Sequence, residues 1–390
     1  MRRALLIVLD SVGIGNAPDA ASFGDKGANT VGHIRETVTD FAIPTLDKAG
    51  LSAAEAIAAG KPVEGEPILS YGCLTEISAG KDTTTGHWEL AGAPVVESFS
   101  VFETFPEELV REMETEAGVT FIGNYAQSGT VILDELGERH LKSGNPILYT
   151  SADSVMQVAA HEDSFGLEKL YEVCRKLRLI ADRERIGRVI ARPFTGLPGN
   201  FTRTSNRHDF SLQPPETLLN HLVSADVDTI GVGKISDIFA GSGINSSRST
   251  KSNEEGCDVI DSLLENYSNR DHLIFANLVD FDMLYGHRRD PEGYGRALMD
   301  FDQWLATLLP RLDDETLLLI TADHGNDPTW SGTDHTRERV PILARFPGAP
   351  QNLGIRETYA DVAATLAEWF GVDSTGSGQS FNPVRSGSTL

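Results

Sequence analysis

Four short apolar runs constrain the fold of this chain more than any other feature of its sequence. They cover residues 4–9, 229–232, 273–279 and 317–321. Their apolar residues are continuous rather than alternating, which is typical of strands that helices cover on both faces of a parallel sheet. Amphipathic helical patterns lie between or after them, at residues 216–223, 293–312 and 359–370. This alternation predicts an α/β fold with a doubly wound, mostly parallel sheet.

The length of 390 residues exceeds what one hydrophobic core usually organises, so we expect two domains. The segment 97–215 has its own helical pattern at residues 164–186 and a strand-like run at 188–194. The predicted strands of the sheet lie before and after it. We therefore predict a core formed by residues 1–96 and 216–390, with residues 97–215 inserted as an α/β cap domain.

The charge and the cysteines narrow the class of protein. A net charge of −24 argues against nucleic acid or anionic membranes as partners, because these surfaces require clustered cations. The three cysteines show no CxxC spacing, which suits a reducing cytoplasm and excludes a metal site built from cysteine. No apolar run approaches the length of a membrane span, and residues 4–9 are too short for a signal peptide. We expect a cytoplasmic enzyme.

Side chains that can bind a metal ion follow three of the apolar runs. They are Asp10, Asp282, His287, Asp323, His324 and His335. Ligands of doubly wound sheets bind beyond the carboxyl ends of the strands, where these residues fall. Carboxylate and imidazole donors suit Mn²⁺, Zn²⁺ or Mg²⁺, and two such ions roughly 4 Å apart can hold both oxygens of a phosphoryl transfer. Any one of these residues alone could be a loop cap or a surface histidine, but together they predict a two-metal site.

The segment GKDTTTGHWE, residues 80–89, offers a nucleophile. It joins a cation, a carboxylate and three hydroxyl groups in a turn bounded by glycines, where a hydroxyl can be exposed to substrate. The spacing of a P-loop is absent. By itself the segment could equally be a capped turn, and the neighbouring metal donors are what favour a catalytic role.

Long motifs in every part of the chain resemble those of the phosphopentomutases, a family of the alkaline phosphatase superfamily. In the core they are VLDSVGIGNAPDA, GKDTTTGHWE, GKISDIF, NLVDFDMLYGHRRD and TADHGNDPTWSGTDHTRE. In the inserted segment they are YTSADSVMQVAAHE and ARPFTGLPGNFTRTSNRHD. The resemblance covers nearly the whole chain and implies an alkaline-phosphatase-like core.

The resemblance also implies roles for these residues. Thr83 would be the nucleophile that carries a phosphoryl group, and Thr84 and Thr85 would not. One metal would be held by Asp10, Asp323 and His324 and would also touch the Thr83 oxygen. The second would be held by Asp282, His287 and His335. The usual ion of the family is Mn²⁺, which gives two Mn²⁺ ions per chain.

Arginines are concentrated in the inserted segment. Six of them, at positions 183, 185, 188, 192, 203 and 207, surround the single acid Glu184. Arginine suits phosphate because its planar group donates two hydrogen bonds at once. We assign Arg183 and Arg185 to a solvated helix, and we predict that Arg192, Arg203 and Arg207 contact substrate. The resemblance adds Ser151, Asp153 and Lys234 as contacts to the sugar or its far phosphate.

The resulting hypothesis is an isomerase that interconverts ribose 1-phosphate and ribose 5-phosphate, and the 2-deoxy pair. Phosphorylated Thr83 would form a bisphosphate intermediate, and a sugar bisphosphate such as glucose 1,6-bisphosphate would prime the enzyme. The alternatives are a cofactor-independent phosphoglycerate mutase, a metal-dependent phosphatase or phosphodiesterase, and a non-catalytic metal-binding protein. The preferred sugar, the resident metal and the oligomeric state are not predicted.

Overall fold

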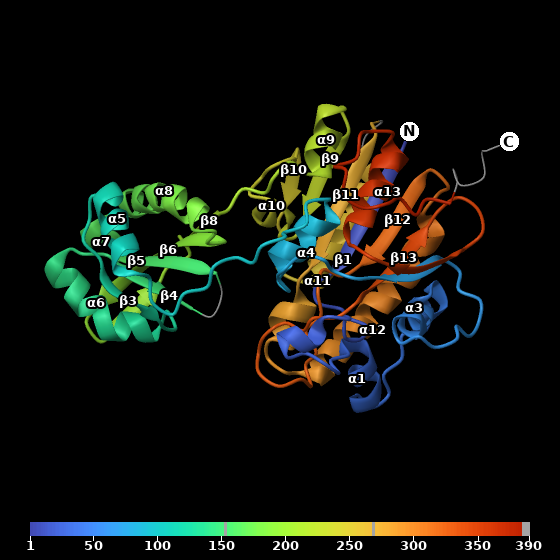
Figure 1. Ribbon diagram of the computed structural model, residues 1–390, viewed down its shortest axis with the longest axis horizontal. Helices are drawn as coiled ribbons and strands as arrows, with labels where there is room; N and C mark the ends of the chain where they lie inside the picture. The colour runs from blue at the N-terminus through green and yellow to red at the C-terminus, as the bar shows by residue number, and fades with distance from the viewer. Residues whose placement is uncertain (152–153, 267–269, 384–390) are drawn as a thin grey trace. The chain divides into compact units, whose positions relative to one another are not determined.

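The computed structural model describes residues 1–151, 154–266 and 270–383. Contacts divide the chain into two units (Figure 1). The first, here called the core, combines Met1–Glu97 with Pro214–Leu390, and the second, the inserted unit, is Ser98–Gln213. From the sequence we predicted that residues 97–215 form the inserted domain.

The core contains one eight-stranded sheet. Its strands are β1 (Arg3–Leu9), β2 (Ser70–Leu74), β9 (Asp228–Val232), β10 (Ser246–Arg248), β11 (His272–Leu278), β12 (Thr316–Thr321), β13 (Val340–Arg345) and β14 (Asn352–Arg356). They lie in the order β10-β9-β11-β1-β12-β13-β2-β14. The four predicted runs form β9, β11, β1 and β12, which are adjacent and parallel. This confirms the predicted mostly parallel sheet, although β13 pairs antiparallel with both β12 and β2.

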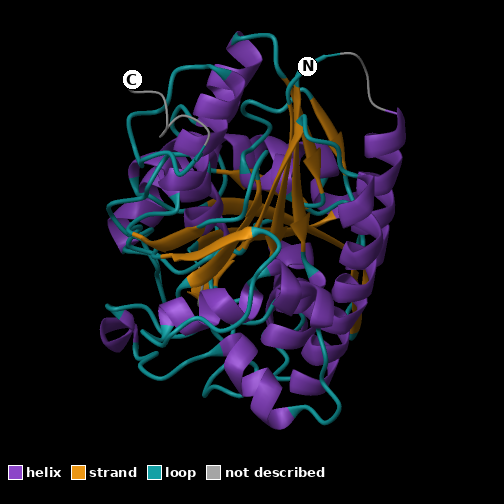
Figure 2. Ribbon diagram, turned by 90° about the vertical axis from the view of Figure 1, so that its right-hand side faces the viewer, coloured by secondary structure: helices purple, strands orange, loops and turns teal. Residues whose placement is uncertain are grey.

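Helices flank this sheet on both sides (Figure 2). They are α1 (Thr30–Thr37), α2 (Pro44–Ala49), α3 (Leu51–Ala58), α4 (Thr83–Leu90), α9 (Leu218–Ser224), α10 (Ile235–Ile238), α11 (Asn253–Asn266), α12 (Pro291–Leu308) and α13 (Ala360–Phe370). The predicted helix at residues 293–312 is α12, which ends early because a 3-10 turn containing Pro310 follows it. Among the described residues, no helix combines the length and apolar character needed to cross a bilayer.

The inserted unit is a smaller α/β fold. Its strands are β3 (Ile122–Ala126), β4 (Ile147–Thr150), β5 (Val155–His161), β6 (Arg188–Leu197), β7 (Asn200–Arg203) and β8 (His208–Ser211). Its helices are α5 (Glu107–Ala117), α6 (Val131–Ser143), α7 (Glu162–Phe165) and α8 (Leu167–Arg183). The strand order is β3-β4-β5-β6-β7, and β8 pairs with β6. Helices α5 and α8 share one apolar cluster with the sheet, and α6 shares another.

Candidate active site

Three of the predicted metal ligands follow neighbouring strands of the core sheet. Asp10 comes directly after β1, Asp282 follows β11, and Asp323 follows β12. Because β11, β1 and β12 are adjacent and parallel, their carboxyl ends meet at one edge of the sheet. All three carboxylates are buried there, with exposed fractions of 1% for Asp10, 7% for Asp282 and 0% for Asp323.

The first group of donors consists of Asp10, Asp323 and His324, whose ligand atoms lie within 4.8 Å of one another. His324 Nδ1 lies 3.1 Å from the carbonyl oxygen of Gly325, which can only accept, so Nε2 is the nitrogen with the lone pair. This Nε2 is 3.5 Å from Asp10 Oδ1 and 3.3 Å from Asp323 Oδ2. Burial, together with the nearby carboxylates of Asp323 and Asp282, raises the pKa of Asp10 to about 7.

The second group consists of Asp282, His324 and His335. Asp282 lies on a π-helical turn, Phe281–Gly286, a distortion frequent at functional sites. His335 Nε2 is 3.4 Å from Asp282 Oδ1. His287, predicted as the third ligand here, is close by, since its Nε2 is 3.2 Å from Asp282 Oδ2 and 3.1 Å from His335 Nε2.

The donor set fits a pair of divalent cations. His287 donates from Nδ1 to the carbonyl of Thr333 at 2.7 Å, so its Nε2 lone pair faces the Nε2 of His335. Two ring nitrogens and a carboxylate that converge in this way suit a shared cation. In the first group, Asp10 Oδ1 is buried and accepts no hydrogen bond from the described residues. A buried carboxylate oxygen of this kind is costly unless a charge of opposite sign compensates it.

Thr83 is the first residue of helix α4, and its hydroxyl faces this donor set. Thr83 Oγ1 lies 3.2 Å from His324 Nε2. Asp82 caps the helix by accepting from the backbone N–H groups of Thr84 and Thr85, and the Thr85 hydroxyl is buried in the same cap. Of the three threonines, Thr83 is therefore the one beside the donors. The positive end of the α4 dipole also favours a phosphate at this position.

Further residues that the sequence did not single out hold the ligands in place. Ser11, which has a positive φ of 78°, donates from its backbone N–H to Asp323 Oδ1 at 3.0 Å. Asn326 donates to Asp282 Oδ1 at 2.7 Å, and Arg289 in turn donates to Asn326 Oδ1 at 2.6 Å. Only their places inside the motifs DSVG, GHRRD and DHGND, beside the predicted ligands, could have drawn attention to them, and spacing alone does not assign these contacts.

Arg337 anchors the loop before Thr83. Its side chain is buried, donates to the carbonyl of Gly80 at 2.6 Å, and forms an ion pair with buried Glu76. Lys81, the residue after Gly80, forms an ion pair with Asp25 at 2.9 Å. Burial raises the pKa of Glu76 well above its usual range, and the guanidinium of Arg337 opposes this shift. The ion pair between Arg337 and Glu76 therefore holds the loop that leads into α4 against the protein interior.

Replacing Arg337 with methionine should lower the free energy of unfolding by about 3–5 kcal/mol, because it leaves the Glu76 carboxylate buried without its partner. The matched control is Arg311→Met, since Arg311 pairs with Asp261 at 2.6 Å on the surface. That change should cost no more than about 1 kcal/mol. Urea denaturation of both variants measures the difference, and equal losses would contradict the structural role given to Arg337.

In the inserted unit, the predicted arginines gather around Tyr149. Arg192 lies on β6, Arg203 ends β7, and Arg207 precedes β8, and both β7 and β8 pair with β6. Burial raises the pKa of the Tyr149 hydroxyl, and all three arginines oppose that rise because their charges are near it. Arg192 also donates to Gln157 at 3.0 Å. The register of the strands thus produces a cationic cluster, here called the arginine cluster, of Arg192, Arg203 and Arg207.

The other predicted substrate contacts are Ser151, Asp153 and Lys234. Ser151 follows β4 in the inserted unit and is half-buried, and Asp153 lies outside the described residues. Lys234 belongs to the core, at the start of α10. Its charge acts against the raised pKa of Asp10, which places Lys234 near the metal donors of the core.

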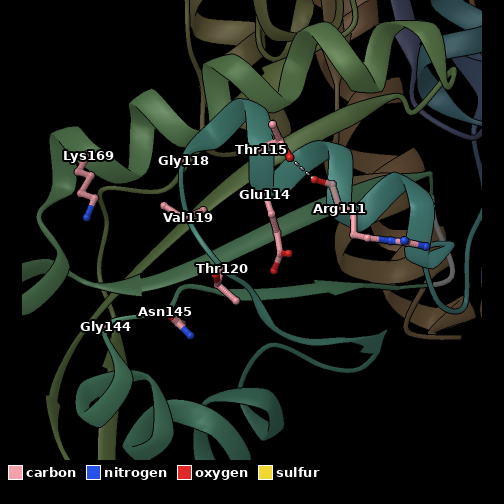
Figure 3. Close-up of a pocket in the computed structure, with 9 residues that line it drawn as sticks. All are labelled: Arg111, Glu114, Thr115, Gly118, Val119, Thr120, Gly144, Asn145 and Lys169. Carbon is pink, nitrogen blue, oxygen red and sulfur yellow. Dashed lines mark hydrogen bonds between the residues drawn. The ribbon is translucent and has the colours of Figure 1, made fainter.

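The inserted unit also carries a surface hollow (Figure 3). It is lined by Arg111, Glu114, Thr115, Gly118, Val119, Thr120, Gly144, Asn145 and Lys169. Polar groups here serve local structure, since Thr115 donates to the carbonyl of Arg111 at 2.7 Å and Glu114 accepts from the Phe121 N–H at 2.8 Å. None of the predicted catalytic or substrate residues lines the hollow.

Comparisons with known proteins show the family of the chain. Residues 2–374 match the Metalloenzyme superfamily. A phosphopentomutase of Symbiobacterium thermophilum is 51% identical over 389 residues, which is 98% of each chain. A phosphopentomutase of Caldanaerobacter subterraneus is 52% identical over 388 residues, 98% of this chain and 97% of the relative. Among solved structures, a phosphoglycerate mutase of Leishmania mexicana shares the fold, with a TM-score of 0.50, 14% identity and 97% of each chain covered.

Proposed function

The chain belongs to the phosphopentomutase family of the metalloenzyme superfamily and is therefore an isomerase, and we propose that it interconverts the 1-phosphates and 5-phosphates of ribose and 2-deoxyribose. The observation that carries the proposal is the position of the Thr83 hydroxyl, 3.2 Å from His324 Nε2 within the cluster of metal donors. A hydroxyl placed there can accept and return a phosphoryl group.

In the proposed reaction, phosphorylated Thr83 gives its phosphoryl group to the free hydroxyl of a pentose monophosphate. The bond between Thr83 Oγ1 and phosphorus breaks, a new bond from phosphorus to the sugar oxygen forms, and on balance the proton of the sugar hydroxyl passes to Thr83 Oγ1. The resulting bisphosphate turns round, and Thr83 takes up the phosphoryl group at the other end. Two Mn²⁺ ions, held by Asp10, Asp323 and His324 and by Asp282, His287 and His335, would neutralise charge on the transferred group and activate the oxygen.

The resting enzyme must first be phosphorylated, and we propose that a sugar bisphosphate such as glucose 1,6-bisphosphate supplies this group. The phosphate that is not being transferred needs a separate set of cations. The arginine cluster of the inserted unit supplies them, with Ser151, Asp153 and Lys234 as further contacts to the substrate. This unit would act as a cap that keeps water from phosphorylated Thr83, since hydrolysis would discharge the enzyme.

Gly129 offers a test of the arginine cluster. A Cβ atom at this position would lie 1.5 Å from Arg203 Nη2 and 2.7 Å from Tyr149 Oη. Because the crowded atom ends a flexible side chain, Gly129→Ala should displace the Arg203 guanidinium while the unit stays folded. Loss of one charge-assisted hydrogen bond to phosphate, about 1.5–3 kcal/mol, should raise KM for ribose 5-phosphate by about 10- to 100-fold and change kcat little.

The matched control is Thr130→Ala, since Thr130 is exposed and its side chain makes no capping hydrogen bond to α6. Steady-state kinetics and thermal unfolding should be measured for both variants. A KM unchanged by Gly129→Ala would remove the arginine cluster from the substrate site.

One assay separates the proposed function from its rivals. The protein is incubated with Mn²⁺, ribose 5-phosphate and catalytic glucose 1,6-bisphosphate, and phosphorus NMR follows ribose 1-phosphate and inorganic phosphate. We expect ribose 1-phosphate at the equilibrium ratio with little inorganic phosphate. Release of phosphate without isomerisation would identify a phosphatase instead.

A further inference from the structure

Two buried polar residues, His87 and Asn277, lie between Thr83 and the carboxylates of the first metal group, and the roles above do not use them. Both have an exposed fraction of 0%. His87 is one helical turn after Thr83 on α4, and its Nδ1 is 2.9 Å from the Thr83 carbonyl oxygen. The same nitrogen is 3.1 Å from Asp323 Oδ2. Since a carbonyl oxygen only accepts, Nδ1 carries the hydrogen and Nε2 is the acceptor.

Asn277, on β11, continues the contacts on the other side of the ring. Its Nδ2 lies 3.3 Å from His87 Nε2 and donates to Asp10 Oδ2 at 3.0 Å. The opposite orientation of the amide would turn its oxygen toward a lone pair and a carboxylate, so these neighbours fix the orientation. His87 and Asn277 thus connect the backbone of Thr83 with both Asp10 and Asp323.

Close packing keeps this connection rigid. A Cβ atom at Gly86 would lie 2.1 Å from the Asp323 carbonyl oxygen, so α4 approaches the Asp323 loop more closely than any larger residue allows. The His87 ring also stacks on Phe275 of β11, with centroids 5.8 Å apart and planes inclined by 23°. The imidazole is therefore held between α4 and the sheet.

We propose that His87 and Asn277 are positioning residues, which hold the nucleophile turn and the carboxylates of Asp10 and Asp323 in one fixed geometry. The inference rests on the proposed function, because it assumes an ion at the first group. Outer-shell partners of this kind orient ligands before the ion binds, and their removal typically weakens metal affinity about 10- to 100-fold. Both side chains are fully buried, so a positioning role rather than a direct contact with substrate is assigned to them.

The test is the affinity for Mn²⁺, measured by isothermal titration calorimetry on the full chain. His87→Ala should weaken one of the two Mn²⁺ sites by about 10- to 100-fold and lower kcat, with partial recovery at high Mn²⁺. His87→Asn should stay within about threefold of wild type, because the asparagine amide nitrogen can replace Nδ1 as the donor. Should His87→Ala fail to fold, Asn277→Ala carries the same expectation.

The control is Leu90→Ala, which removes buried apolar volume from the same helix without touching the donors. It should lower thermal stability but leave both Mn²⁺ affinities unchanged. Equal weakening by Leu90→Ala, or two wild-type affinities in His87→Ala, would overturn the inference. If the unaltered protein itself bound fewer than two Mn²⁺ ions, the result would contradict the proposed function. That result differs from a failure of the positioning role, in which the unaltered protein binds two ions and His87→Ala binds them equally well.

Discussion

Thr83→Ala should abolish isomerisation of ribose 5-phosphate, with a loss of about 10⁴-fold or more, because the variant lacks the oxygen that carries the phosphoryl group. Thr83 Oγ1 is the threonine oxygen that lies beside His324 Nε2, so no neighbouring hydroxyl can take its place without moving the helix. Thr83→Ser, which keeps a hydroxyl, should retain measurable activity. Phosphorus NMR measures the turnover of each variant.

Thr84→Ala is the matched control, since the Thr84 hydroxyl makes no hydrogen bond among the described residues and its backbone N–H keeps the bond to Asp82. It should leave turnover nearly unchanged. Intact mass spectrometry after incubation with glucose 1,6-bisphosphate adds a second readout, because only proteins that keep a hydroxyl at position 83 should gain a phosphoryl group. A Thr83→Ala protein that isomerises normally would disprove the nucleophile assignment.

Asp282→Ala should reduce the number of bound Mn²⁺ ions from two to one and lower activity by about 10³-fold. Asp282 is the carboxylate of the second donor group, and it meets His335 at 3.4 Å and His287 at 3.2 Å. Loss of one ion removes several kcal/mol of stabilisation of the transferred phosphoryl group. Burial raises the pKa of Asp282, but hydrogen bonds with His287 and His335 outweigh burial and hold the pKa well below its usual value.

The control is Asp280→Asn, because Asp280 is also buried and nearby but belongs to neither donor group. Calorimetric titration with Mn²⁺ should give two ions for this control and one for Asp282→Ala. Chelation of wild type should also lower its thermal stability, since an ion at about 100 times its Kd adds roughly 2.7 kcal/mol to a fold that alone binds it. Two ions of unchanged affinity in Asp282→Ala would refute the two-group arrangement.

Much of the core could be predicted from local patterns. The runs that became β1, β9, β11 and β12 are continuous and apolar because both faces of these strands are covered, and continuous burial leaves a clear signature. Strands β2, β10, β13 and β14 were not predicted. Strand β10 has only three residues, at one edge of the sheet. Strands β2, β13 and β14 form the side of the sheet that contains antiparallel pairs, and β14 is half-exposed, so its residues carry no comparable apolar run.

The sequence by itself determined which chemistry is available: six metal donors beyond strand ends, a threonine in a capped turn, and arginines suited to phosphate. Only the tertiary structure decided which of these candidate donors lie together. It places His324 in both groups of donors and the Nε2 of His287 3.2 Å from Asp282 Oδ2, whereas the family resemblance implied two separate triads. Arg337, His87 and Asn277 likewise acquired their places only through folding. The physical reason is that strand order and helix packing set the distances between side chains far apart in the chain, and no local pattern encodes those distances.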